Sequence, residues 1–574
     1  MPAYSKQIYE FGPFRLNPAA RTLLCNGEPV SLTAKVFDLL LMLVQNSGRV
    51  IEKAELLKSV WQDAFVEENN LTVSVAALRK ALGETPREYL YIETIPKRGY
   101  HFIAQVREVR DENVDRAIDS IAILPLANTS DDPDLAYLSD GITESIINSL
   151  SQLPYLKVMA RSTVFRYRQP DVDPRLAGLE MRVRAVLVGR VLHLGDKLVV
   201  KTELVDVADG SQIWGEQYNR PASDIFSVQE EIAKEVSEKL RLKLTSEERL
   251  RLSKRYTANT EAYHLYLKGR YLLTRHTTEL SIKAIEFFER AIEIDPNYAL
   301  AYAGIADSYF SLSAVHLPPK KALPMSKAAA IKAIEIDDEL ADAHISMGLI
   351  KVWYDHDWRG AEKEYKRAIE LNPGAALAHQ RYATYLAFIG RLDEAMLELK
   401  RAQELDPLSL QTNVNMGTLL SVMHQYERAI NQLKKTLEID LNYYPAHYAL
   451  GCAYIQTGNF DEAIAAFEQV CRLEEDSHIA LGYIGHAYAR EGKTDEAERV
   501  LKELKELSKQ QYISPYSIAL VYIGLEQRDE AFKWLEKTYE DQNDMLVWLK
   551  IAPEVDSLRS DPRFADLMLR VGFH

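Results

Sequence analysis

Amide, hydroxyl and basic side chains gather in two segments near the start of this 574-residue sequence. In the first segment, helical spacing places Leu71, Val75, Leu78 and Leu82 on one face, which we expect to be buried. The opposite face would then expose Asn69, Asn70, Thr72, Val73, Ser74, Ala76 and Arg79. Asn pairs bidentately with adenine, Arg pairs with guanine or phosphate, and an apolar side chain contacts the thymine methyl. A helix with these groups on its exposed face could contact the bases and phosphates of double-stranded DNA.

The second segment, residues 91–102, has the pattern of a two-stranded hairpin with a basic tip. Lys97 and Arg98 lie at that tip, and Lys80 lies near the end of the preceding helix. We expect these three cations to contact phosphates or the minor groove. Such contacts give affinity and carry little sequence information.

Elements that could position both segments precede them. Residues 8–16, 22–25 and 29–32 are short alternating runs broken by Gly, Pro and Asn, which predicts small antiparallel strands. Amphipathic patterns then predict helices at 34–45 and 53–61. Strands, three helices and a terminal hairpin are the parts of a winged helix-turn-helix, an α+β domain that we assign to residues 1–106.

Residues 66–83 resemble the recognition helix of the OmpR/PhoB-type DNA-binding domain, and residues 93–100 resemble its wing, most closely in the CadC/ToxR branch. The resemblance implies that the indole N–H of Trp61 and the hydroxyl of Thr94 donate hydrogen bonds to phosphates. It also implies that the loop 62–68 touches RNA polymerase.

The sequence departs from that family pattern in two ways. Ala76 and Ala77 stand where many members have a long polar residue, and Pro96 stands where some have a wing arginine. Few base contacts and weak binding by one copy are therefore expected, so two or more copies would act together on DNA. The family's members also carry a receiver domain before the winged helix or a membrane helix after it, whereas residues 107–117 form a charged linker. We therefore expect the regulatory input to come from the domains that follow.

A period of 34 residues dominates the second half of the sequence. Alanines recur at this spacing at 361, 395, 429, 463, 497 and 531. The period is that of the tetratricopeptide repeat, so an all-α solenoid of about eight repeats is predicted for residues 258–541, with a C-terminal cap at 542–574. The resemblance implies a superhelix whose concave face binds a protein or peptide. Homo-oligomerisation and a purely scaffolding role are the alternatives.

Residues 118–245 alternate apolar runs and helical patterns, which predicts a small α+β middle domain. Asp140 and Glu144 are interpreted as the start and capping pair of a helix, and Trp214 as a core residue. The segment resembles the TolB-like N-terminal domain found beside tetratricopeptide repeats in bacterial signalling proteins. Whether it binds a small ligand or only connects two modules stays open.

Charge restricts any DNA contact to the first domain. The chain has a net charge of −15, but residues 1–106 hold 12 basic and 11 acidic residues, whereas the remainder holds 57 and 73. An acidic surface repels DNA. The three cysteines, the absence of a signal-peptide pattern and the absence of an apolar run of membrane-spanning length predict a cytoplasmic protein without a membrane segment.

The sequence offers no pattern for catalysis. Gly492-Lys-Thr lacks the upstream glycine of a phosphate-binding loop, since residue 487 is alanine, and the histidines lack metal-ligand spacing. No cofactor, metal or enzymatic activity is predicted. The leading hypothesis is a one-component transcription regulator that binds promoter DNA, with the solenoid as an interaction or sensing module. The alternative is a scaffold that uses the winged helix to dock proteins.

Overall fold

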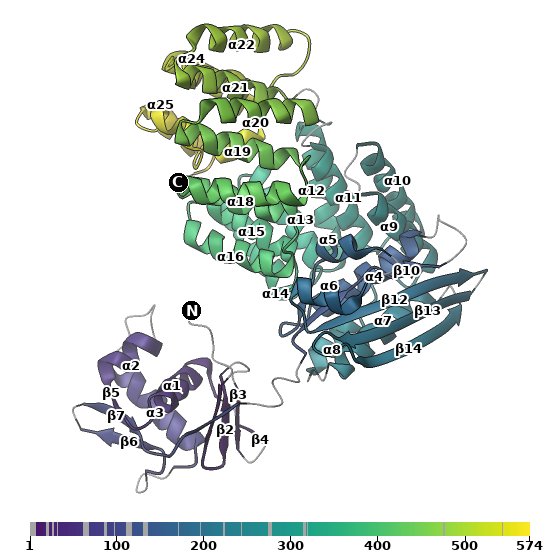
Figure 1. Ribbon diagram of the computed structural model, residues 1–574, viewed down its shortest axis with the longest axis vertical. Coiled ribbons are helices and arrows are strands. Elements are labelled where there is room, and N and C mark those ends of the chain that lie inside the picture. Colours follow the sequence, from purple (N-terminus) through teal and green to yellow (C-terminus); the bar gives the residue numbers. More distant parts are fainter. Residues whose placement is uncertain are drawn as a thin grey trace. The chain divides into compact units, whose positions relative to one another are not determined.

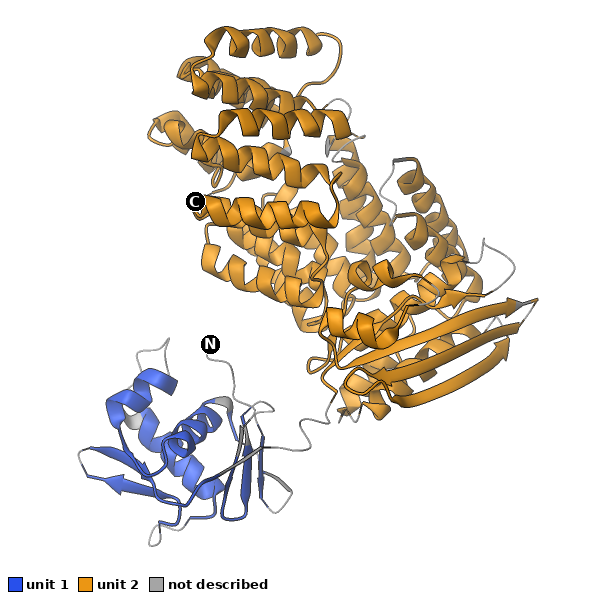
Figure 2. Ribbon diagram, viewed as in Figure 1, with its two compact units in different colours: residues 1–117 blue, residues 118–574 orange. Residues whose placement is uncertain are grey.

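The computed structural model divides into two compact units, residues 1–117 and 118–574 (Figure 2). It describes residues 7–18, 22–25, 28–30, 32–60, 68–84, 89–96, 98–110, 118–129, 136–169, 172–195, 197–221, 224–240, 242, 244–273, 278–313, 317, 319–474, 477–541 and 543–573. No helix among these residues is long and apolar enough to cross a membrane.

The first unit opens with an antiparallel sheet of strand order β4-β3-β2-β1-β8. Its strands are β1 (Gln7–Phe11), β2 (Phe14–Asn17), β3 (Thr22–Cys25), β4 (Glu28–Val30) and β8 (Arg107–Arg110). The run expected over 8–16 is split because Gly12, with φ at +54°, turns the chain between β1 and β2. The prediction of a linker from residue 107 needs correction, because β8 pairs with β1 and adds an edge to this sheet. Residues 111–117 lie outside the described part of the chain.

Three helices and a small second sheet complete this unit, as the winged-helix prediction requires. The helices are α1 (Ala34–Gln45), α2 (Lys53–Val60) and α3 (Glu68–Ala81). The second sheet has the order β5-β7-β6, built from β5 (Val50–Glu52), β6 (Ile92–Ile95) and β7 (Gly99–Phe102). Gly99 allows β5 and β7 to approach closely, since a Cβ atom there would lie 1.8 Å from the carbonyl oxygen of Ile51.

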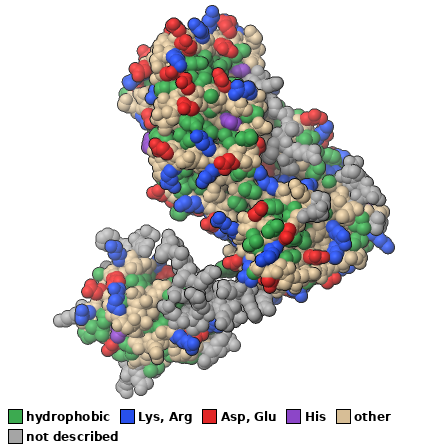
Figure 3. Space-filling model, viewed as in Figure 1, with side chains coloured by type: hydrophobic (Ala, Val, Ile, Leu, Met, Phe, Trp, Pro, Cys, Tyr) green, Lys and Arg blue, Asp and Glu red, His purple; other side chains and the backbone are tan. Residues whose placement is uncertain are grey.

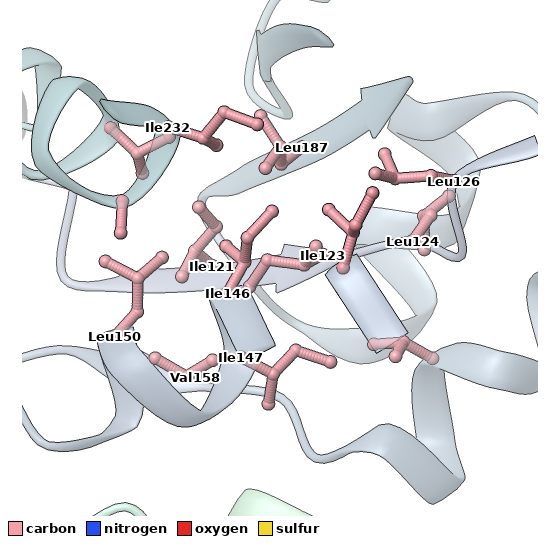
Figure 4. Packing of buried hydrophobic residues seen from close by; sticks show 14 of the residues in the cluster. Ile121, Ile123, Leu124, Leu126, Ile146, Ile147, Leu150, Val158, Leu187 and Ile232 are labelled. Carbon is pink, nitrogen blue, oxygen red and sulfur yellow. The ribbon is translucent and has the colours of Figure 1, made fainter. Parts of the chain in front are cut away.

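The second unit begins with a mixed sheet of order β11-β9-β12-β13-β14, with β10 paired to β12. The strands are β9 (Ser120–Ile123), β10 (Ala127–Asn128), β11 (Lys157–Val158), β12 (Ala185–Leu194), β13 (Lys197–Asp206) and β14 (Gln212–Pro221). The helical elements of this part are α4 (Ala136–Ser151), α5 (Arg161–Val164), η2 (Phe165–Tyr167), α6 (Pro174–Met181), α7 (Ile225–Lys239) and α8 (Ser246–Leu252). Ile146 and Leu150 of α4, Ile121 and Leu187 of the sheet, and Ile232 of α7 pack into one apolar core (Figure 4).

The prediction that Asp140 and Glu144 begin and cap a helix is wrong. Helix α4 already begins at Ala136, so both residues lie inside it. Ala136 and the residues after it form one further helical turn before Asp140 and Gly141, the pair that suggested a helix start. Trp214 is buried, as predicted.

Sixteen antiparallel helices of the described residues form the repeat solenoid (Figure 1). They are α9 (Thr260–Leu273), α10 (Thr278–Ile294), α11 (Ala299–Ser313), α12 (Pro319–Ile336), α13 (Ala341–Trp353), α14 (Trp358–Leu371), α15 (Ala376–Phe388), α16 (Leu392–Leu405), α17 (Leu410–Val422), α18 (Tyr426–Ile439), α19 (Tyr444–Thr457), α20 (Phe460–Leu473), α21 (His478–Glu491), α22 (Thr494–Leu507), α23 (Pro515–Gly524) and α24 (Arg528–Glu540). The small residues of the period lie where paired helices touch. A Cβ atom at Gly417, for example, would lie 2.5 Å from Leu433. The predicted all-α solenoid is thus present.

The C-terminal residues do more than cover the end of the stack. They form η4 (Asp544–Trp548), η5 (Pro553–Leu558) and α25 (Pro562–Arg570). Helix α25 contacts α24, but Trp548 also packs on Phe388 with ring centroids 4.8 Å apart. Phe573 stacks on Trp358 at 4.4 Å. This segment therefore ties the last repeats to α14 and α15, many residues earlier in the chain.

The middle domain and the solenoid share one apolar core, so residues 118–574 form a single unit rather than two separate modules. The backbone N–H of Gly374 donates to the carbonyl of Ser151 at 3.0 Å, and that of Ala160 donates to Leu405 at 2.9 Å. The hydroxyl of Thr163 donates to Asp406 at 2.7 Å. Loops between repeats therefore hold α4 and α5 directly. On the visible face of this unit, acidic and basic side chains are interspersed (Figure 3).

Candidate nucleic-acid interface

Helix α3 has one buried and one exposed face, as its spacing predicts. Leu71, Val75, Leu78 and Leu82 are at most 3% exposed and form the core with α1 and α2. On the other face Asn70, Thr72, Ala76, Ala77 and Lys80 are exposed, and Ser74 is half-buried. Val73 is 61% exposed. The exposed face thus combines amide and hydroxyl groups with one apolar contact point.

Arg79 does not lie free on that face, which corrects the expectation that it points away from the domain. Its Nη2 atom donates to the carbonyl of Ile92 and to the hydroxyl of Thr94, both at 2.8 Å. Its Nε atom lies 3.4 Å from the fully buried carboxylate of Glu84, and its guanidinium stacks on Tyr89 at 4.4 Å. Arg79 therefore fixes α3 against strand β6 of the wing.

Glu84 also holds the end of α3 against strand β6. Its carboxylate also accepts a hydrogen bond from the backbone N–H of Ile92 at 2.9 Å. The Arg79–Glu84 pair was not predicted from the sequence, because a carboxylate five residues after an arginine is also typical of a solvated helix end. The order in sequence gives no sign that both residues meet the same strand.

Thr94 is exposed and keeps a proton to donate. Because Arg79 donates to its oxygen, the hydroxyl hydrogen is available to another acceptor, such as a phosphate. Arg98 is also exposed, in the tight turn closed by its own N–H and the carbonyl of Ile95 at 3.1 Å. Thr94, Arg98 and the exposed face of α3 thus belong to one compact unit.

Aromatic packing sets the base of the wing. Phe11 of β1 contacts Tyr91 and Phe102, with ring centroids 5.8 and 5.1 Å away. Burial raises the pKa of Tyr91, and the nearby Cys25 and Glu84 add to this effect. The phenol therefore stays neutral in this cluster, which links the first sheet to the wing.

Several predicted contact residues lie outside the described part of the chain. These are Trp61, Lys97 and nearly all of the loop 62–68. Asn69 lies within α3, but its side chain is not described. Their assignments stay predictions.

Models of known families match three parts of the chain. Residues 27–102 match "Transcriptional regulatory protein, C terminal", and residues 117–235 match "HilA/YgeH-like transcriptional regulator, second domain". The tetratricopeptide repeat matches residues 271–298, 352–409 and 448–512. The TolB-like assignment of the middle domain is not among these matches and stays a prediction.

Three curated relatives show how far the likeness extends. "Transcriptional regulator HilA" of Salmonella typhi is 27% identical over 401 residues, which are 68% of this chain and 69% of that protein. "Transcriptional activator CadC" of Escherichia coli is 32% identical over 100 residues, 17% of this chain and 20% of that protein. "Putative adenylate cyclase 3" of Rhizobium meliloti is 34% identical over 238 residues, 41% of this chain, and the match spans 40% of that protein.

These matches agree with the fold and with the exposed helix. The chain is similar to HilA and CadC, and its first domain matches the OmpR/PhoB-type DNA-binding domain. The same chain carries tetratricopeptide repeats after a HilA-like second domain.

Proposed function

We propose that this protein controls transcription by binding promoter DNA through α3 and the wing. The observation that carries the proposal is the division of α3 into a fully buried face and an exposed face with Val73 at its centre. A helix of this kind beside a hairpin fits the width of the major groove.

The exposed residues have distinct roles in this proposal. Asn70 and Thr72 contact base edges, together with Asn69 and Ser74, and Val73 contacts a thymine methyl. Lys80, Thr94 and Arg98 contact phosphates, together with Trp61 and Lys97. Arg79 acts indirectly, because it holds Thr94 and the wing in position. RNA polymerase is the proposed partner of the loop 62–68.

Ala76 and Ala77 on the exposed face have short side chains that can make few contacts with bases. More than one copy of the protein is therefore proposed to act on a promoter. The solenoid would supply the interaction or sensing function, either by binding a protein or peptide or by homo-oligomerisation. The tetratricopeptide matches support a protein-binding role. We propose that the protein acts in the cytoplasm, without catalytic activity.

A salt titration separates this function from a protein-docking scaffold. The full chain is titrated with sheared genomic duplex DNA at several salt concentrations. Neutralised phosphates release counterions, so log K should fall with log salt with a slope of roughly −0.9 per phosphate contact. A folded chain that shows no duplex binding, or binding independent of salt, would favour the scaffold.

A further inference from the structure

A cavity of about 530 Å³ lies inside the second unit, between the middle domain and the repeat solenoid. Helices α4 and α5 form one side, and α9, α13 and α15 form the other. Cavities that hold small molecules have volumes of roughly 300–1,000 Å³. This space is thus large enough for a small organic molecule, and its walls come from two parts of the chain.

An ion cluster joins the two walls. Glu144 of α4 lies 3.2 Å from Nε of Arg161 in α5 and 2.6 Å from Nη2 of Arg270 in α9. Burial alone would raise the pKa of Glu144, but Arg270 and Arg161 lower it below its ordinary value. The carboxylate is therefore ionised and offsets much of the positive charge of these two arginines.

Arg381 of α15 has no such close ion pair in the described part of the chain, although Tyr365 and Asp307 attract its charge from a greater distance. Among the described residues, its guanidinium has neither a hydrogen bond nor a carboxylate within 4.0 Å, and its Nε atom is buried. Asp307, an acidic neighbour, instead accepts a hydrogen bond from Ser346 at 2.6 Å and lies 3.9 Å from Arg270. Although the residue is partly exposed, no described protein group pairs with its charge, so the site can accept an anionic partner.

The neighbouring residue on α15 shows the same deficiency. Gln380 is only 3% exposed, yet its Nε2 atom has no hydrogen-bond partner among the residues that the structure describes. Both Gln380 and Arg381 line the cavity. Two adjacent side chains that line the cavity thus have N–H groups without an acceptor among the described residues.

The rest of the lining is mixed, with carboxylates such as Asp342 beside apolar and aromatic side chains. Leu267, Leu340 and Ile345 contribute aliphatic surface, and Tyr266 and Tyr298 contribute aromatic rings. A ligand that fits these walls has an apolar body and one anionic group.

We propose that this cavity binds a small carboxylate-bearing molecule with an apolar body, whose carboxylate is received by Arg381 and Gln380. A guanidinium matches a carboxylate in a two-bond arrangement, and the amide adds a further donor. Carboxylates of the same lining, such as Asp342, repel a doubly charged phosphate more than a singly charged group. Because its walls come from the middle domain and from the solenoid, an occupied cavity fixes one against the other. Only a resulting effect on transcription rests on the proposed function; ligand binding does not.

The test measures binding of three matched probes to the full chain by saturation-transfer difference NMR: 4-phenylbutyrate, its neutral amide and phenyl phosphate. We expect 4-phenylbutyrate to bind at least about tenfold more tightly than the amide, since the amide lacks the charge that Arg381 receives. Equal binding of acid and amide would overturn the proposal, as would the absence of transfer to any probe. Tighter binding of phenyl phosphate would overturn the carboxylate assignment.

Variants locate the site. Arg381→Ala and Gln380→Leu should each weaken 4-phenylbutyrate binding, the former by about tenfold or more, and Arg381→Lys should retain part of it. Arg472→Ala, on the exposed surface of α20, is the matched control and should bind like the unaltered chain. Circular dichroism checks the fold of each variant.

The assignment would be overturned if folded Arg381→Lys and folded Gln380→Leu bind 4-phenylbutyrate as tightly as Arg472→Ala does. Val73→Glu should not change probe binding, so a failure of DNA binding remains distinguishable.

Discussion

The two units of this protein place their polar groups in opposite ways. In residues 1–117 the amide, hydroxyl and basic groups of α3 and the wing are largely exposed, and Arg79 is the exception that braces them. In residues 118–574 a set of charged side chains is gathered between two packed layers, around Glu144. On the two proposals made above, the first unit meets its partner at its surface, and the second within a cavity.

The largest predicted effect concerns the buried cluster. Glu144→Ala leaves Arg161 and Arg270 without their carboxylate, so the second unit should lose about 3–5 kcal/mol of stability. Urea unfolding of the full chain, followed by circular dichroism, measures the loss. Glu370→Ala is the control, because its exposed pair with Arg367 should contribute less than about 1 kcal/mol. Equal effects of the two substitutions would show that the cluster does not hold the layers together.

A pH dependence tests burial within the solenoid. Burial lowers the pKa of His486 to about 4, although the Leu520 carbonyl opposes the shift. In the unfolded chain the pKa is about 6.5, so the unfolded state binds more protons between those values. Stability should therefore fall as the pH drops from about 6.5 towards 4, by about 3 kcal/mol in total.

His486→Gln should remove that part of the pH dependence, whereas the partly exposed His447→Gln should not. Urea midpoints at several pH values provide the comparison. An unchanged pH profile in His486→Gln would show that this histidine is not held neutral in the folded state.

Arg79 distinguishes bracing from contact with DNA. Arg79→Ala leaves the buried carboxylate of Glu84 without its cation, so the first unit should lose about 1–3 kcal/mol. Thermal unfolding of the full chain, with the transition of the first unit followed separately, measures this. If stability is unchanged while DNA binding is lost, Arg79 contacts DNA and the bracing role is wrong.

Lys80 should give the smallest effect. Its exposed side chain can be removed without loss of stability, and Lys80→Ala should lower the salt slope of duplex binding by about 0.9. Lys332→Ala, on the solenoid, serves as the control and should leave the slope unchanged. A slope that Lys80→Ala does not change would exclude a phosphate contact there.

Local patterns predicted much of the fold. The expected helix 34–45 coincides with α1, because its apolar spacing and the preceding threonine mark it within one segment. The 34-residue period likewise predicted the solenoid from local signals, since each repeat carries its own small and large residues. The buried face of α3 followed from helical spacing alone.

The candidate sites were harder to predict because they depend on contacts between distant residues. Glu144 and Arg270 are 126 positions apart, and nothing in either segment indicates that they pair. Arg79 and Thr94 are 15 positions apart and meet only when the wing folds against α3. The one local signal for the cavity is a pair of polar residues, Gln380 and Arg381, on a repeat helix with many apolar residues.

The central claim is that the exposed face of α3 selects DNA sequence. Genomic fragments are selected by the purified full chain at about 150 mM salt and sequenced, in parallel with Val73→Glu. We predict a recurring motif for the unaltered chain and its loss for Val73→Glu, which remains folded because residue 73 is 61% exposed. Recovery of the same motif by both chains, or no selective retention by a folded chain, would contradict the account.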